Sequence, residues 1–332
     1  MSEDVWTAQD TTPDEIESAL RRLLRERHAA NPSIAPARVL NLVVVVDSGL
    51  KGEIAERLSQ VGRYNASRTI LCSVEEGRDT LDAVAVMSYD ESPGGSLTVV
   101  HERVEIDIGP EHLARLDTIV DPVLVSEITT MLWAPHGHDE AASVLMPFLD
   151  VILMDSDDQA DAGAGFARAE DCLREVYVVD LAWLRTTPWR ERLAASFDPP
   201  DRRAGLARLN EVSVRHAPSS KASASLLVGW LCSRLDWNGE RPGIQLDAVE
   251  QEAPGLAGVT VSWGEESSLS LDRGRGGLLA RERGADGQER VWRVLGSSRG
   301  EGGILGEGVR QALLRDPTYG PALIAAQEVC TV

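Results

Sequence analysis

The longest apolar run in this sequence places the strongest constraint on how the chain can fold. This run, residues 39–46 of a predicted strand at 38–47, is rich in β-branched side chains and is interrupted only at Asn41. Such a run is typical of a central strand whose two faces are both covered. A turn follows, residues 50–61 carry apolar side chains at helical spacing, and a second apolar run occupies residues 67–74. The pattern predicts a strand–helix–strand unit and therefore an α/β sheet.

Further elements are expected on both sides of this unit. Residues 10–30 predict a helix, because Thr12 is a suitable N-cap, Pro13 suits the first turn and the apolar residues form one stripe. Residues 82–89 and 96–107 are joined by a turn-rich link. They predict an antiparallel hairpin on an otherwise parallel sheet.

The middle of the chain changes in character. Residues 155–165 hold four aspartates among alanine and glycine, which indicates a solvated loop. Helical patterns dominate residues 166–236, where we expect a lone strand at 211–216 and an amphipathic helix at 219–236. This stretch is therefore predicted to be mainly helical.

The last part of the chain predicts a second sheet. Residues 243–295 contain short alternating runs separated by glycine, typical of antiparallel strands, and closing helices are expected near 303–314 and 319–327. The predicted fold class is α/β, with an N-terminal mixed, mostly parallel sheet with helices, a central helical segment and a C-terminal antiparallel α+β domain. We expect four regions: residues 1–36, an N-terminal helix and linker; 37–165, the α/β domain; 166–240, the helical segment; and 241–332, the antiparallel sheet with closing helices.

Charge and composition exclude several functions. The chain has 53 acidic and 33 basic residues and a formal net charge of −20. It is therefore expected to bind neither nucleic acid nor an anionic membrane surface. Lysine occurs only at Lys51 and Lys221, which disfavours Schiff-base chemistry and lysine-dependent phosphate loops. The polar amino terminus, the absence of a spanning apolar segment and four widely spaced cysteines predict a cytoplasmic protein with reduced thiols.

No catalytic motif stands out. Gly49 and Gly52 follow the first predicted strand but do not fit Gly-x-Gly-x-x-Gly, and Asp47 would repel a pyrophosphate there. His136 and His138 sit in a loop, which makes a poor preformed metal site. A Gly-x-Ser-x-Gly nucleophile motif is also missing. The sequence therefore predicts no catalytic residue, no cofactor and no metal site.

Arginine recurs beside tryptophan or small hydroxyl residues in three clusters: Arg63, Ser67 and Arg68; Trp183, Arg185, Trp189 and Arg190; and Trp230, Arg234 and Trp237. The third cluster has spacings of four and three, which predicts one helix face with an arginine between two indoles. Tryptophan and arginine are enriched where protein interfaces concentrate their binding energy. The alternative is that these tryptophans belong to the core and the arginines pass over them to solvent or to salt bridges. We expect at least one cluster to bind a ligand or partner.

At these clusters the sequence resembles the OpcA family of glucose-6-phosphate dehydrogenase assembly proteins. The resemblance rests on Asn-Ala-Ser-Arg-Thr-Ile at 65–70, on residues 121–133, on 180–190 ending Thr-Pro-Trp-Arg, and on 227–237. It extends over roughly residues 35–240, with a looser match in the C-terminal sheet. The family typically has proline before the Ser-Arg pair and a doubled tryptophan in the central segment. Ala66 and a single Trp133 stand there in this chain.

The resemblance implies a non-catalytic, cytoplasmic allosteric activator that binds glucose-6-phosphate dehydrogenase and promotes its assembly. It would serve glucose metabolism through the oxidative pentose phosphate pathway and its NADPH supply. The partner-binding residues would come from the three clusters: Arg63, Arg68, Trp183, Arg185, Trp189, Arg190, Trp230, Arg234 and Trp237. The alternative is a sugar-phosphate or nucleotide-binding enzyme whose site lies in the α/β domain, with Arg63, Ser67 and Arg68 holding a phosphate.

Overall fold

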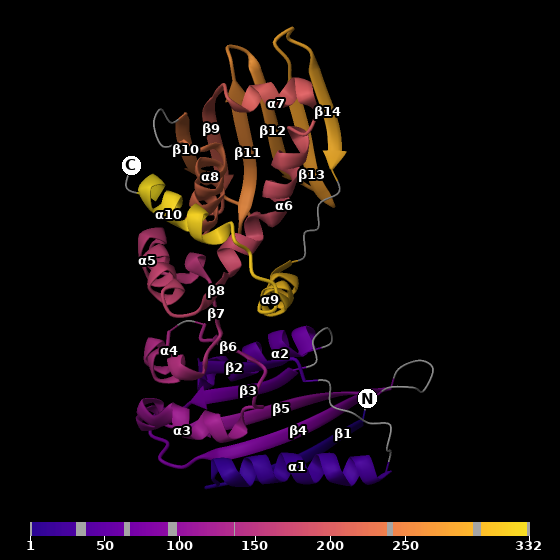
Figure 1. Cartoon of the computed structure of the whole chain (residues 1–332), viewed down its shortest axis with the longest axis vertical. Helices are drawn as coiled ribbons and strands as arrows, with labels where there is room; N and C mark the ends of the chain where they lie inside the picture. Colours follow the sequence, from indigo (N-terminus) through magenta and orange to yellow (C-terminus); the bar gives the residue numbers. More distant parts are fainter. Residues whose placement is uncertain are drawn as a thin grey trace. The chain divides into compact units, whose positions relative to one another are not determined.

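The structure is a computed structural model that describes residues 2–30, 38–62, 67–91, 98–135, 137–237, 242–294 and 300–330 (Figure 1). Contacts divide the chain into two compact units. The first comprises Met1–Met154, Glu175–Val179 and Leu305–Leu314, and the second comprises Asp155–Arg174, Asp180–Ile304 and Arg315–Val332. The four regions expected from the sequence, with boundaries after residues 36, 165 and 240, stay predictions.

The first unit is built on an eight-stranded sheet with strand order β1-β4-β5-β3-β2-β6-β7-β8. Its strands are β1 (Ser2–Ala8), β2 (Leu40–Asp47), β3 (Ser67–Val74), β4 (Asp82–Glu91), β5 (Thr98–Ile108), β6 (Thr129–Trp133), β7 (Val151–Met154) and β8 (Tyr177–Asp180). Its helices are α1 (Pro13–Ala30), α2 (Lys51–Gly62), α3 (Leu116–Val120) and α4 (Asp139–Leu145). The mixed, mostly parallel sheet predicted for the amino-terminal half is confirmed.

The apolar run becomes the central strand β2, as predicted. Its residues from Leu40 to Val46 are all buried, and it pairs in parallel with β3 on one side and β6 on the other. The predicted hairpin is confirmed as the antiparallel pair β4–β5. Strand β1 was not predicted; it pairs antiparallel with β4 at the sheet edge, where a polar strand with one exposed side is tolerated.

Helix α1 begins where the sequence predicts. The backbone N–H of Glu15 donates to Thr12 Oγ1 at 3.4 Å, and the N–H of Thr12 donates to Glu15 Oε2 at 3.1 Å. This reciprocal pair is a capping box, which satisfies two N–H groups that a helix start otherwise leaves free. Ile16 and Leu20 of the apolar stripe are buried.

The second unit contains a six-stranded sheet with order β10-β9-β11-β12-β13-β14. Its strands are β9 (Leu209–His216), β10 (Gly243–Ala248), β11 (Leu256–Trp263), β12 (Ser267–Gly274), β13 (Gly277–Arg283) and β14 (Glu289–Val294). Its helices are α5 (Ala162–Leu173), α6 (Leu181–Ser196), α7 (Pro200–Leu206), α8 (Lys221–Leu235) and α10 (Tyr319–Cys330). Helix α9 (Gly300–Gln311) has its residues divided between the two units.

Two expectations about this sheet are wrong. Strand β9 is not a lone strand, because it pairs with both β10 and β11. The sheet is not wholly antiparallel either, because β9 and β10 run parallel. Helix α8 lies between these two strands in sequence and returns the chain to the same end of the sheet, which is how parallel neighbours are connected.

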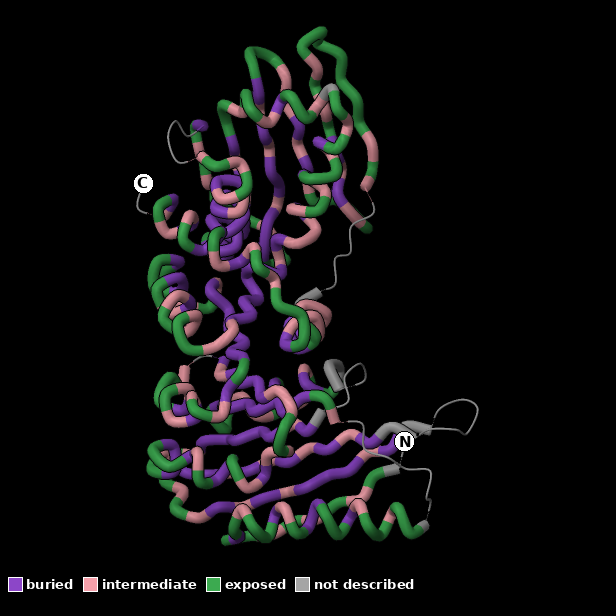
Figure 2. The backbone as a smooth tube through the Cα atoms, viewed as in Figure 1, coloured by how far each residue is buried: buried purple, intermediate pink, exposed green. Residues whose placement is uncertain are grey.

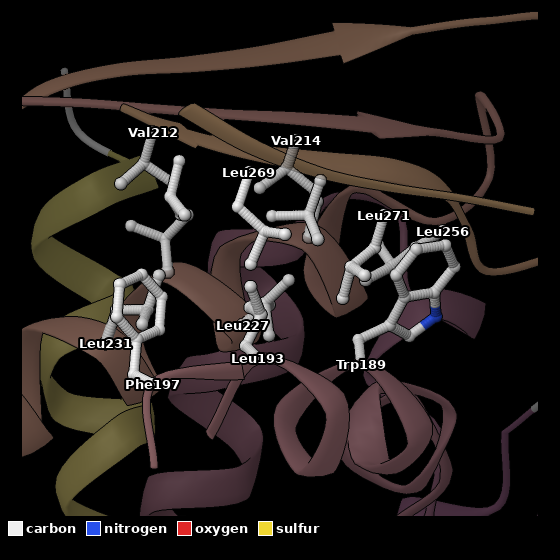
Figure 3. Packing of buried hydrophobic residues seen from close by; sticks show 14 of the residues in the cluster. Trp189, Leu193, Phe197, Val212, Val214, Leu227, Leu231, Leu256, Leu269 and Leu271 are labelled. Carbon is white, nitrogen blue, oxygen red and sulfur yellow. The ribbon is translucent and has the colours of Figure 1, made fainter. Parts of the chain in front are cut away.

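Helices cover one side of this second sheet and enclose its core (Figure 1). Trp189 and Leu193 of α6, Phe197 directly after that helix, and Leu227 of α8 pack on the buried side of the sheet (Figure 3). In strand β11 the buried positions 259, 261 and 263 alternate with partly exposed ones, as expected for a sheet with one covered face (Figure 2). The second unit therefore has its own hydrophobic core.

Helices α8 and α10 approach each other closely at Gly229. A Cβ added at this residue would lie 2.2 Å from the carbonyl oxygen of Ala322 and 2.9 Å from the Cβ of Ala326. We expect Gly229→Ala to lower the free energy of unfolding by about 1–3 kcal/mol, because overpacking outweighs the gain in helix propensity. Denaturant titration measures the loss. Gly306→Ala is the control, because a Cβ there meets nothing within 4 Å, and equal losses for the two variants would contradict the prediction.

Candidate functional site

The first arginine cluster is only partly described. Arg63 lies outside the described residues, as does the side chain of Ser67. Arg68, on β3, is only 2% exposed, and its Nε donates to Glu102 Oε2 at 2.8 Å while its Nη1 donates to Glu17 Oε2 at 2.8 Å. This guanidinium therefore joins β3 to β5 and α1, and a phosphate in solvent has no access to it.

The second cluster lies on α6, and the structure brings only part of it together. The guanidinium carbon of Arg190 lies 3.5 Å from the ring centroid of Trp183, and Trp183 Nε1 donates to Asp316 Oδ2 at 2.9 Å. Burial lowers the pKa of Arg190 to about 10, so the guanidinium stays charged at neutral pH. Trp189 is buried in the sheet core. These contacts attach the segment before α10 to helix α6.

Arg185 binds two aspartates from the segment expected to be a solvated loop. Its Nη1 and Nη2 donate to the two carboxylate oxygens of Asp155 at 2.7 and 2.6 Å, and Asp157 Oδ2 lies 3.4 Å from Nη1. The side chains of Asp155 and Asp157 are 6% and 7% exposed. The expectation of a solvated loop is wrong here, because the arginine that neutralises these carboxylates comes from a helix further along the chain.

A third buried carboxylate, Asp180, completes this polar network. It caps α6 by accepting from the N–H of Ala182 at 2.9 Å, and it also accepts from the Ser156 hydroxyl at 2.6 Å and the Tyr319 hydroxyl at 2.9 Å. Burial raises the pKa of Asp180 and that of Tyr319. Asp157 accepts from the N–H and hydroxyl of Ser223 at 3.0 and 2.5 Å, near the start of α8. The network thus joins α6, α8 and α10.

A pocket of about 820 Å³ adjoins this network within the second unit. Its lining includes Asp157 and Asp161, the ammonium-bearing Lys221 and the thiol-bearing Cys330. Two carboxylates beside one ammonium give it no single charge preference, so the pocket does not define a ligand class.

The third cluster is more exposed than the second. Trp230 and Trp237 are partly buried against the sheet core, and Arg234 is exposed. Helix α8 ends at Leu235, and Asp236 follows with a left-handed backbone (φ 54°). The prediction of one continuous helix face is therefore wrong for Trp237. We call Trp230, Arg234 and Trp237 the α8 end.

Among the described residues, no group of three or more His, Cys, Asp or Glu side chains is placed to share a metal ion. His136 lies outside the described residues, and His138 Nε2 lies 3.1 Å from Asp47 Oδ1. Within the described ranges, no helix is both long enough and apolar enough to cross a membrane.

The fold is that of a two-unit α/β protein. Most arginines and tryptophans of the three clusters connect its helices and strands. Two family models match it. One, described as a glucose-6-phosphate dehydrogenase subunit N-terminal domain, matches residues 58–171, and the other, the C-terminal domain of that subunit, matches residues 176–323. The chain belongs to the OpcA family.

Curated relatives agree with this assignment. Proteins provisionally named OxPP cycle protein OpcA are 26% identical over 199 residues in Synechococcus elongatus and 24% identical over 196 residues in Nostoc punctiforme. These alignments cover 58% and 57% of this chain but only 44% and 42% of the relatives. The chain thus spans less than half the length of the curated relatives it matches. The alignment with a solved scyllo-inositol dehydrogenase from Lactobacillus casei covers 89% of this chain and 96% of the dehydrogenase chain. At 9% identity and a TM-score of 0.35, this similarity is too weak to assign a fold or a function.

Sequence reasoning missed the buried carboxylates. Asp180 was detectable in principle, because an aspartate directly before a helix is a typical N-cap. Asp155 directly follows strand β7, but no local pattern indicates that its side chain is buried. The partner of Asp180, Tyr319, is 139 residues away, and no local pattern indicates such a contact.

Proposed function

We propose that the chain is a non-catalytic assembly factor and allosteric activator of glucose-6-phosphate dehydrogenase. It would favour the dehydrogenase's active oligomer and so support glucose metabolism through the oxidative pentose phosphate pathway and its supply of NADPH. The observation that carries the proposal is the match to both domain models of a glucose-6-phosphate dehydrogenase subunit, at residues 58–171 and 176–323.

Such a role needs differential binding and no chemistry of its own. A protein that binds the assembled dehydrogenase more tightly than its separate subunits shifts the population toward the assembled state. The direct test mixes the purified chain with the dehydrogenase from the same genome. Light scattering follows the oligomeric state while NADPH formation is measured. Unchanged oligomeric state and unchanged activity at saturating concentrations would reject the proposal.

Of the three clusters, the α8 end is the best candidate contact. Arg68, Trp183 and Trp189 are buried, and Arg185 and Arg190 already have carboxylate or aromatic partners. The α8 end combines two partly exposed indoles with an exposed guanidinium. These residue types supply most of the hot spots in measured interfaces.

Trp230→Ala is expected to weaken binding of the dehydrogenase by about 2–4 kcal/mol, which corresponds to roughly a 30-fold to 1,000-fold rise in Kd. The loss follows from removing apolar area that the partner would bury. Isothermal titration calorimetry measures the change, and circular dichroism checks that the fold persists. Trp6→Ala is the matched control, because Trp6 is also partly buried but lies on β1 of the first unit. If wild type and Trp230→Ala bind the dehydrogenase with equal affinity, the α8 end is not part of the interface.

A further inference from the structure

The second sheet has a face that none of its described helices covers. Helices α6, α7 and α8 lie on one side of it (Figure 1). Residues that point to the other side are partly or fully exposed, apart from Gly258. Over the middle strands this outer face carries mainly short hydroxyl side chains: Ser213, Thr260, Ser262, Ser268 and Ser270.

The strand register gathers arginines at one end of this outer face. Arg281 and Arg283 of β13 lie opposite Ser270 and Ser268 of β12. On the other side, β14 places Val291 opposite Arg281 and Arg293 opposite Leu279. Same-face neighbours are about 7 Å apart along a strand and about 5 Å apart between strands. Arg281 therefore neighbours both Arg283 and Arg293, and the three form one basic stripe along β13 and β14, with Glu289 of β14 opposite Arg283 on the same face.

Little of this positive charge is neutralised within the chain. Arg281 lies 3.7 Å from Glu289 in a half-exposed pair. Arg283 and Arg293 are exposed, and neither forms an ion pair among the described residues, although Glu289 lies opposite Arg283 in the strand register. Arg281 is repelled by its two arginine neighbours, and one carboxylate, that of Glu289, faces these three guanidinium groups. This local positive charge contrasts with the whole chain, in which 53 acidic residues outnumber 33 basic ones.

The outer face is also large enough for a specific interface. Six strands about 4.8 Å apart, each of 6–8 residues at about 3.3 Å per residue, form a face of on the order of 500–600 Å². Covering it would bury about 1,000–1,200 Å² in total, the lower end of the range for specific protein complexes. The exposed Val291, together with Leu279, supplies apolar contact beside the arginines.

We propose that the outer face of the second sheet docks an acidic protein surface, with Arg281, Arg283 and Arg293 forming the charge-complementary part of the contact. This inference rests on the proposed function, and the acidic surface belongs to the glucose-6-phosphate dehydrogenase. Binding relieves the repulsion among the arginines and supplies the carboxylates that they lack. Because α8 lies on the opposite side of the same sheet, one chain presents two separate surfaces, as a bridge between two subunits requires.

The test compares the wild type with the triple variant Arg281→Glu, Arg283→Glu and Arg293→Glu. We expect the variant to bind the dehydrogenase at least tenfold more weakly at low salt, mainly through slower association. Wild-type affinity should fall as salt rises, and the variant should lose most of that dependence. Surface plasmon resonance over a salt series measures both effects. Circular dichroism checks that the variant is folded, because Arg281→Glu and Arg283→Glu place glutamates beside Glu289 of β14.

The control variant carries Arg22→Glu, Arg25→Glu and Arg115→Glu, three exposed arginines of the first unit. It changes the net charge by the same amount, so unchanged binding in the control assigns the effect to the outer face. If wild type binds and both triple variants bind equally well, the outer-face proposal fails and the proposed function stands. If wild type does not bind, both fail. A self-associated species of this chain that only the outer-face reversal removes would assign the face to a second copy and overturn the acidic-partner proposal.

Discussion

Replacing Arg68 by methionine is expected to lower the free energy of unfolding of the first unit by about 3–5 kcal/mol, the usual cost of removing one partner from a buried ion pair. Its guanidinium donates to Glu102, Glu17 and the carbonyl oxygen of Val123. Glu102 is 1% exposed on its side chain. It would therefore keep a desolvated charge, and among the described residues Arg38 would be its remaining ion-pair partner. Denaturant titration with a probe in the first unit measures the loss.

The control for Arg68 shares one of its carboxylates. Arg21 bonds to Glu17 at 3.0 Å, but its side chain is 71% exposed. Because exposed helix pairs contribute little, Arg21→Met should change the unfolding free energy by less than about 0.5 kcal/mol. Adding Glu102→Gln to Arg68→Met should recover part of the loss, because the stranded charge is then removed. If Arg68→Met lowers the unfolding free energy by less than about 1 kcal/mol, Arg68 is not needed to compensate the buried charge of Glu102.

The elements of the first unit that sequence predicts well are those with local signals. A long β-branched run is difficult to place anywhere but in the centre of a sheet, and β2 lies there. Thr12 and Glu15 determine the start of α1 within four residues of chain. Strand β1 has no such signal, because its partner β4 lies some eighty residues further along and supplies the pairing.

The site residues were harder to predict, because the sequence alone does not show whether an arginine faces solvent or a buried carboxylate. Arg68 and Arg185 both contact acids more than 25 residues away. Trp189 and Trp230 lie in two clusters of similar composition, yet one is core and the other partly exposed. Only the tertiary contacts distinguish a core tryptophan from one available to a partner.

The stability of the second unit should depend on pH through Asp157. Burial raises the pKa of this carboxyl from 3.8 to about 7, with the neighbouring charge of Asp155 acting in the same direction and the Ser223 bonds and Arg185 opposing it. The folded state therefore holds the proton more tightly than the unfolded state. The stabilisation is fully present below pH 4 and is lost as pH rises to about 7.

Asp157→Asn isolates this contribution, because asparagine keeps the shape of the protonated acid and can still bond to Ser223. Between pH 4.5 and 7.5, we expect the variant to gain about 3 kcal/mol of unfolding free energy relative to wild type, at about 1.4 kcal/mol per pKa unit. Denaturant titrations across this range measure the difference, which should level off above pH 7. Asp198→Asn, which removes an exposed carboxylate of the same unit, controls for the loss of one negative charge.

The shape of the curve decides the interpretation. If the difference between Asp157→Asn and wild type stays constant from pH 4.5 to 7.5, Asp157 is ionised in the folded protein throughout, and Arg185 balances both aspartates. If the difference rises as expected, the Asp157 carboxyl carries a proton in the folded protein at acidic pH and releases it near pH 7. In that case α8 is held to the network through a group that changes charge near neutral pH, since Asp157 is the carboxylate that bonds to Ser223.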